Sequence, residues 1–178
     1  MKIALFPGHV GKDSGAIDKF SADDGLYTIE ATINSAITAY AHSFLNILNI
    51  SNSVYYGSFE KRIKDSWDCY FGVSIHCDWI DDESLSGYHL IHWPGSQGGS
   101  KLSKLIQIAM DEYTEIEESR PIQTRTDLAI IRNTTFPTVI LEAGFLSHIE
   151  EEDRLNNPET QISIGFSIAA AIQKIVKK

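Results

Sequence analysis

Short apolar runs typical of β-strands alternate along this chain with stretches in which apolar residues recur at helical spacing. Such alternation predicts βαβ units, in which a helix connects two parallel strands. The expected strands lie within residues 1–8, 53–56, 70–75, 87–93 and 138–141, and the expected helices within 29–48, 59–67, 102–113 and 162–176. The pattern therefore limits the fold to the α/β class with a mostly parallel sheet.

Three further segments carry narrower expectations. A loop rich in Gly, Asp and Ser is expected over residues 11–25, between the first strand and the first helix. The alternation in residues 87–93 suits an exposed or edge strand. The acids of residues 150–153 are expected to be a solvated helix start, because acidic side chains are favourable near a helix N-terminus.

Polar side chains stand where the expected strands end. His9 follows the first strand, His76 follows the third, and Glu142 follows the last. Glu30 lies in the first turn of the first expected helix. In open α/β sheets ligands bind in the crevice outside the carboxyl ends of the strands. We therefore expect the three side chains that follow strands to converge at one edge of the sheet.

Two histidines and two carboxylates in these places indicate a zinc hydrolase. A catalytic zinc site uses three protein ligands and leaves its fourth position open to water. His9, Glu30 and His76 would supply the ligands, and Glu142 would be the base near the water. Each residue taken alone is more often structural than a ligand, so the hypothesis depends on their combination. The same ligand types also accept cobalt or manganese.

Size and composition narrow the class of protein. The 178 residues predict one domain, residues 1–178, and the net charge of −9 argues against a nucleic-acid partner. The chain has two cysteines and no paired cysteine motif, so a metal would be held by His and carboxylate. No apolar run approaches the roughly 20 residues of a membrane span, and we expect no insertion into a membrane.

The beginning of the chain lacks the pattern of a signal peptide. Its apolar stretch carries one positive charge and is stopped by Pro7 and Gly8, which makes it too short for a signal-peptide core. We therefore expect synthesis in the cytoplasm without a signal peptide. A monomer is the expected oligomeric state.

Several segments, in order along nearly the whole chain, resemble the motifs of zinc-dependent N-acetylmuramoyl-L-alanine amidases of the type-3 amidase family. The segments are FPGHVGKDSGA at residues 6–16, Glu30, SIHCD at 74–78, DLAIIR at 127–132 and PTVILEAGFLSH at 137–148. The sequence departs from the usual pattern at Val10, Asp78 and His148, and none of these changes removes a candidate ligand.

The resemblance implies a three-layer α/β/α fold with the zinc site at the carboxyl ends of the strands. It implies one Zn²⁺ ion at His9, Glu30 and His76, and a catalytic glutamate at Glu142. The implied substrate is peptidoglycan, and the implied reaction is hydrolysis of the amide between the lactyl group of N-acetylmuramic acid and the L-alanine of the stem peptide.

Two further residues are candidates for substrate binding. Asp78 follows the second histidine closely and would add negative charge near the metal, although it would equally suit a solvated loop. Arg132 is a candidate donor to the oxyanion of the tetrahedral intermediate, as is a nearby backbone N–H. The alternative for Arg132 is pairing with one of the many surface acids.

A catalytic domain without a secretion signal resembles a phage or prophage endolysin. Such a protein accumulates in the cytoplasm and acts on the cell wall after its release. The expected setting is therefore cell-wall degradation and cytolysis.

Three alternatives stay open. A zinc peptidase acting within the stem peptide is one, although such folds usually carry a His-x-x-Glu pair and here Lys12 stands three residues after His9. A peptidoglycan-binding module without catalysis is another, and loss of Glu142 or of a ligand would be its mark. A nucleophilic Cys77 beside His76 is the third, although adjacent residues of a strand point to opposite faces.

Overall fold

A six-stranded sheet runs through the middle of the molecule in the computed structural model, which describes residues 1–17 and 28–177. The strand order is β2-β1-β3-β6-β4-β5. Every neighbouring pair is parallel except β4 and β6, which are antiparallel. The strands are β1 (Ile3–Pro7), β2 (Asn52–Val54), β3 (Phe71–Asp78), β4 (His89–His92), β5 (Gln123–Thr124) and β6 (Thr138–Phe145). The predicted mostly parallel sheet is confirmed.

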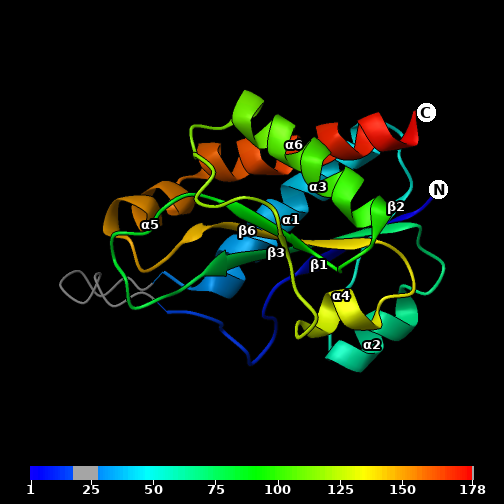
Figure 1. Cartoon of the computed structure of the whole chain (residues 1–178), viewed down its shortest axis with the longest axis horizontal. Coiled ribbons are helices and arrows are strands. Elements are labelled where there is room, and N and C mark those ends of the chain that lie inside the picture. Colours follow the sequence, from blue (N-terminus) through cyan, green and yellow to red (C-terminus); the bar gives the residue numbers. More distant parts are fainter. Residues whose placement is uncertain (18–27, 178) are drawn as a thin grey trace.

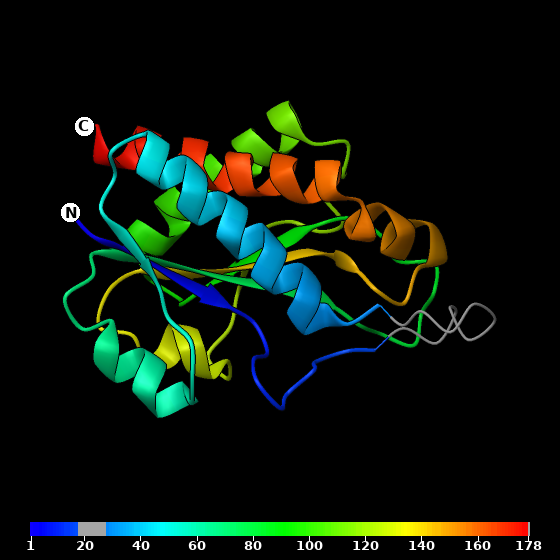
Figure 2. The same ribbon diagram turned by 180° about the vertical axis from the view of Figure 1, so that it is seen from behind.

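Helices cover both faces of this sheet, which completes the three-layer arrangement (Figures 1 and 2). The long helices α1, α3 and α6 lie on one face, and the short helices α2 and α4 lie on the other. The helices are α1 (Glu30–Ile47), α2 (Phe59–Asp65), α3 (Gln97–Tyr113), α4 (Ala129–Asn133), α5 (Ile149–Asn156) and α6 (Pro158–Val176). Among the described residues, none of the helices combines the length and apolarity needed to cross a membrane.

The two faces of the central strands contribute to separate apolar cores. Along β1, Leu5 packs beneath the long helices, whereas Phe6 packs beneath α2 and α4. A strand buried on both faces reads as a continuous apolar run, because successive side chains point to opposite sides. This burial explains why the first strand can be recognised in the sequence.

The β4 strand corrects one expectation. All four of its residues are buried, and the strand lies between β6 and β5 rather than at the edge of the sheet. The edge is β5, which has only two residues, so no repeating pattern in the sequence could predict it. Part of the loop expected over residues 11–25 lies outside the described residues.

The start of α5 corrects the expectation of a solvated helix start over residues 150–153. Glu150 is exposed, but Glu151 and Glu152 are buried. The Glu151 carboxylate accepts hydrogen bonds from the backbone N–H groups of Phe145, at 2.6 Å, and Gly87, at 2.7 Å. Buried backbone N–H groups require an acceptor, which Glu151 provides. Its two hydrogen bonds connect the segment before β4 to the end of β6. The prediction of a solvated helix start is wrong at these two positions.

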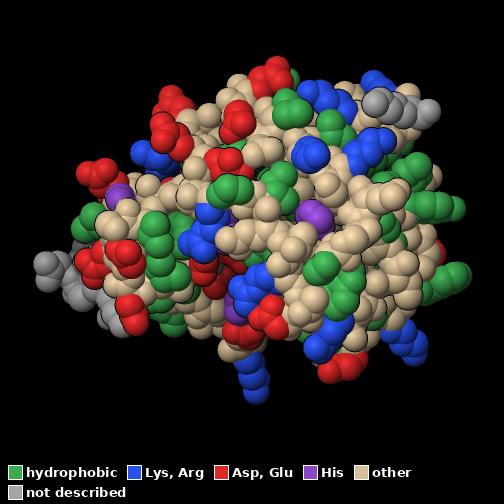
Figure 3. Space-filling model, viewed as in Figure 1, with side chains coloured by type: hydrophobic (Ala, Val, Ile, Leu, Met, Phe, Trp, Pro, Cys, Tyr) green, Lys and Arg blue, Asp and Glu red, His purple; other side chains and the backbone are tan. Residues whose placement is uncertain are grey.

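The surface reflects the acidic composition. Acidic side chains gather on the part of the molecule that carries α5, at the left of Figure 3. Basic side chains are fewer, in keeping with 15 Lys and Arg against 24 Asp and Glu.

Candidate metal centre and active site

The carboxyl ends of β1, β3 and β6 bring three of the predicted residues together. His9 comes two residues after β1, in a turn where its own φ is +48°. The backbone N–H of Gly8 donates to the carbonyl of Ile75 at 2.7 Å, which holds this turn against β3. A side chain at Gly8 would overlap the ring of His76, so only glycine allows this close approach.

His76 and Glu142 lie inside their strands rather than after them. The two residues are register partners in the β3–β6 pair, and the strands continue to Asp78 and Phe145. The register shifts between His76 and Asp78, as at a β-bulge. Bulges redirect side chains near functional sites. The expected strand ends at residues 75 and 141 fall three and four residues short of the observed ends, because pairing continues beyond the apolar run.

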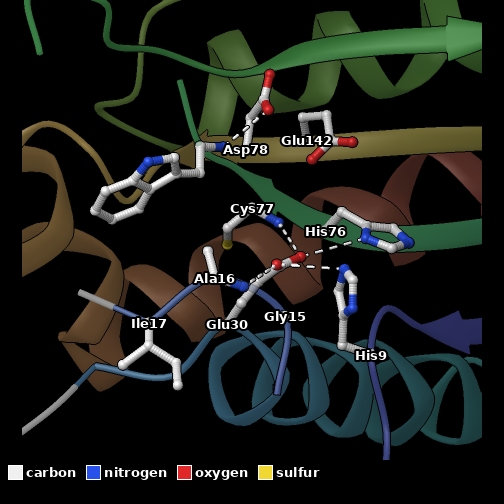
Figure 4. Close-up of a pocket in the computed structure, with 10 residues that line it drawn as sticks. His9, Gly15, Ala16, Ile17, Glu30, His76, Cys77, Asp78 and Glu142 are labelled. Atoms are coloured by element: carbon white, nitrogen blue, oxygen red, sulfur yellow. Dashed lines mark hydrogen bonds and ion pairs between the residues drawn. The ribbon is translucent and has the colours of Figure 1, made fainter. Parts of the chain in front are cut away.

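Glu30 is the centre of the cluster. One carboxylate oxygen lies 3.3 Å from Nε2 of His9, and the other lies 3.3 Å from Nδ1 of His76 (Figure 4). One candidate ligand atom from each of these three residues lies within 4.8 Å of the others. Two ligands of a tetrahedral zinc ion with bonds of about 2.0 Å are separated by about 3.3 Å. The donor types and their separations therefore fit a zinc ion.

Hydrogen bonds hold the Glu30 carboxylate in place. It is 3 % exposed and accepts from the backbone N–H of Ala16 at 2.9 Å, that of Cys77 at 3.2 Å and the side-chain amide of Asn34 at 3.0 Å. Burial alone would raise the pKa of Glu30, but the hydrogen bonds from His76 and Ala16 outweigh burial and lower it. The carboxylate is therefore ionised, as a metal ligand must be.

Asp13 lies within ion-pair distance of His9, a contact that the sequence analysis did not predict. Its Oδ2 lies 2.9 Å from Nδ1 of His9, on the side of the ring away from Glu30. A carboxylate on the second ring nitrogen fixes the tautomer of a metal-binding histidine and increases its basicity. The contact with His9 lowers the pKa of Asp13. The available signal was the spacing of four residues within one glycine-rich loop.

Glu142 lies across the site from Glu30, on β6 (Figure 4). Burial raises its pKa well above the ordinary value, and the negative charges of Asp78 and Glu30 raise it further. A general base is most effective when its pKa is near the working pH, and such shifts are typical of catalytic carboxylates. Glu142 is thus a suitable proton acceptor.

Two cavities meet at the cluster, and both are lined by His9, His76 and Glu142. The first has a volume of about 460 Å³ and extends past Ile17, Asp78 and Trp79. The second has a volume of about 550 Å³ and extends between α2 and α4; we call it the α2–α4 cavity. A substrate bound across the cluster would therefore place one part in each cavity.

The two candidate substrate-binding residues have different surroundings. Asp78 lines the first cavity, and burial, reinforced by the charge of Glu30, raises its pKa. Arg132 is exposed in the last turn of α4 and lines neither of the two cavities as described. Its positive charge contributes to a lowered pKa of Asp127. The structure thus brings Asp78, but not Arg132, to the cluster.

Cys77 faces away from His76, as expected for neighbours on a strand. Its side chain is buried in the core beneath the long helices, where Sγ lies 3.5 Å from the side-chain oxygen of Asn34. Burial raises the pKa of this thiol well above its ordinary value. A thiol that resists ionisation is a poor nucleophile, which argues against the cysteine alternative.

Replacement of Gly15 by alanine is expected to weaken zinc binding by about 10- to 100-fold. Gly15 has φ of +66°, and a Cβ there would overlap the Glu30 carboxylate and the ring of His9. The matched control is Gly11→Ala, because Gly11 has φ of +71° but open space around the added atom. Competition with a zinc-binding dye measures both affinities, and equal affinities for the two variants would contradict the prediction.

His89 is expected to make the metal-free protein less stable in acid. It is the register partner of Glu142, is 2 % exposed and stacks on Phe145. Burial, together with the charges of Arg120 and Arg125, lowers its pKa from 6.5 to about 4.

Since the folded state binds this proton less readily than the unfolded state, stability is retained above pH 6.5 and falls between pH 6.5 and about 4. Over this pH range, His89 is expected to lower the free energy of unfolding by about 3 kcal/mol. Urea unfolding in the presence of a chelator should show a shallower decline for His89→Gln than for the wild type. Equal slopes would contradict the prediction.

Comparisons with known proteins identify relatives of this chain. Residues 3–174 match the family described as N-acetylmuramoyl-L-alanine amidase. A putative N-acetylmuramoyl-L-alanine amidase of Buchnera aphidicola is 25 % identical over all of this chain and 97 % of its own length.

Solved structures share the fold. The amidase AmiC2 of Nostoc punctiforme has a TM-score of 0.88 at 20 % identity and covers 100 % of this chain and 98 % of its own. The catalytic domain of CwlV from Bacillus (Paenibacillus) polymyxa has a TM-score of 0.87 at 23 % identity and covers 99 % and 98 %. At these identities the likeness establishes the arrangement of the elements alone.

Proposed function

This chain belongs to the N-acetylmuramoyl-L-alanine amidase family, and from that premise we propose that it is a zinc-dependent hydrolase of peptidoglycan. The bond cleaved is the amide between the lactyl group of N-acetylmuramic acid and the L-alanine of the stem peptide. The observation that carries the proposal is the cluster of His9, Glu30 and His76 facing Glu142 at the junction of two cavities. The proposed catalytic unit is a single domain, residues 1–178.

Each residue of the site has a separate role in the proposed reaction. His9, Glu30 and His76 would hold the metal, and Asp13 keeps the His9 ring in its orientation. When bound, zinc polarises the scissile carbonyl and lowers the pKa of a water to about 7. Glu142 accepts a proton from the attacking water and passes it to the leaving amine of L-alanine. Arg132 has no role in this scheme, because it lies outside both cavities.

Digestion of purified peptidoglycan tests the proposal. The wild type should release new N-terminal L-alanine ends and leave the glycan intact, as seen by amine labelling and mass spectrometry. A chelated sample and the Glu142→Gln variant should release none above background. New ends elsewhere in the stem would favour a zinc peptidase, and no new ends at all would favour a binding module.

The proposed biological setting is a phage or prophage endolysin that acts on the wall after release from the cytoplasm. Coexpression in a host with and without a protein that forms pores in the inner membrane tests it. Lysis that depends on the pore is the expected result. Lysis without the pore would contradict this setting and leave the hydrolytic activity unaffected.

A further inference from the structure

The α2–α4 cavity contains a positive charge that the mechanism does not use. Its volume of about 550 Å³ falls within the range typical of small-ligand sites. Phe59, Leu128 and Ile130 give it apolar walls, and Arg62 from α2 lines it among them. The pattern of residues 59–67 predicts a helix there but does not mark Arg62 as buried.

Arg62 is buried without a counter-ion. Its residue is 9 % exposed, and one terminal nitrogen donates to the carbonyl of Pro7 at 2.7 Å. The guanidinium lies over the ring of Phe6, 5.6 Å from its centre. Its Nε is buried with no partner, and no carboxylate among residues 1–17 and 28–177 forms an ion pair with it.

A buried charge without a partner is costly, and proteins rarely keep one that has no use. Burial lowers the pKa of Arg62 and is the sole influence on it, so no anionic side chain of the described protein compensates this charge. A guanidinium in this state suits a carboxylate, which it can bind through two parallel hydrogen bonds. The ligand is therefore expected to be anionic.

Other cations near Glu142 are less available. Arg125 pairs with Asp127 through its side chain. Arg120 lies over the ring of Phe145, 5.2 Å from its centre, and lines neither cavity as described. Arg62 thus differs in that it combines burial, an Nε without a hydrogen-bond partner and a place in the wall of a cavity.

We propose that the α2–α4 cavity binds the peptide half of the substrate and that Arg62 binds a carboxylate of that peptide. The inference rests on the proposed amidase function. Of the two groups joined by the scissile amide, the peptide carries free carboxylates, whereas the lactyl carboxylate is already consumed in the amide. The apolar walls accommodate the methyl group of L-alanine. The glycan half is left for the first cavity, where Trp79 offers an aromatic face.

The binding of two dipeptides, one with free carboxylates and one without, tests the assignment and requires no hydrolysis. The ligands are L-alanyl-D-glutamate and its diamide, in which both carboxylates are carboxamides, titrated into the zinc-loaded protein by calorimetry. The wild type should bind the acid at least about tenfold more tightly than the diamide, as expected for a hydrogen bond to a charged group. Arg62→Met should remove this preference, and Arg62→Lys should keep part of it.

Arg120→Met is the matched control, because it removes a nearby arginine outside the cavity. It should leave the preference for the acid unchanged. Loss of the preference in Arg120→Met but not in Arg62→Met would overturn the assignment and place the carboxylate on the other side of Glu142. Equal binding of acid and diamide by the wild type would also overturn it.

A second pair of variants covers the case in which Arg62→Met fails to fold, since Arg62 also supports the turn at Pro7. Ala129 is exposed and lines the α2–α4 cavity, so its replacement does not disturb the core. Ala129→Glu should weaken binding of the acid by about tenfold, through competition for Arg62. Ala129→Gln should not, and equal affinities for the two would overturn the inference.

The two proposals fail in different ways. New L-alanine ends from peptidoglycan together with no carboxylate preference would overturn this assignment and leave the amidase function standing. Absence of new ends, whatever the peptide binding, would overturn the function and with it the identity of the ligand named here.

Discussion

Replacement of Glu142 by glutamine is expected to lower kcat for peptidoglycan hydrolysis by about 10³-fold while zinc remains bound. A glutamine has nearly the same shape, but its amide cannot accept the proton of the attacking water. Glu142 lies outside the group of three candidate ligands, so its loss should not release the metal. The variant therefore separates proton transfer from metal binding.

Steady-state kinetics and measurement of zinc per protein chain provide the two readouts. The folded state should not be weakened, because burial and the like charges of Asp78 and Glu30 already disfavour the ionised form of Glu142 and raise its pKa. Glu150→Gln is the control, since it removes an exposed acid at the start of α5. A Glu142→Gln enzyme with the kcat of the wild type would assign the base to another residue.

The residues of the candidate metal centre were predictable because each follows a strong local pattern. β1, β3 and β6 are buried on both faces, so their apolar runs are long enough to recognise, and the polar residue that interrupts each run is conspicuous. Glu30 is similarly marked by the start of a helical stripe. Convergence then follows from parallel strands, whose carboxyl ends share one edge of the sheet.

Other features depend on contacts between distant segments and leave no local pattern. Arg62 stands in a seven-residue helix with mostly polar neighbours, and in the fold its guanidinium contacts the carbonyl of Pro7 and the ring of Phe6 from a distant part of the chain. Glu151 looks like a surface acid until Gly87 and Phe145 supply their backbone donors. The burial of such residues is determined by tertiary structure, which overrides the preference of a charged side chain for solvent.

Replacement of Glu30 by glutamine is expected to abolish both activity and the stabilisation that zinc gives to the fold. A ligand that binds only the folded state adds about 4 kcal/mol to the free energy of unfolding at a thousand times its dissociation constant. The wild type should gain stability of this order when zinc is added to chelated protein. Glu30→Gln should gain little, because the neutral amide replaces the anionic ligand at the centre of the cluster.

The same variant should also be less stable without metal. The Glu30 carboxylate accepts from Ala16 through one oxygen, and from Cys77 and Asn34 through the other. A glutamine must point its NH₂ group at one of these sets of donors, and each buried donor left unpaired costs about 1–3 kcal/mol. Guanidinium unfolding with and without zinc measures both effects, and Glu60→Gln, an exposed glutamate in the first turn of α2, is the control.

The pair of variants then gives a test that neither gives alone. Glu142→Gln should keep the zinc-dependent stabilisation and lose turnover, whereas Glu30→Gln should lose both. If Glu30→Gln were stabilised by zinc as strongly as the wild type, the metal would have to lie elsewhere in the protein. If Glu142→Gln lost the stabilisation, Glu142 would be a ligand, and the proton acceptor would have to be sought among the other groups that line the two cavities.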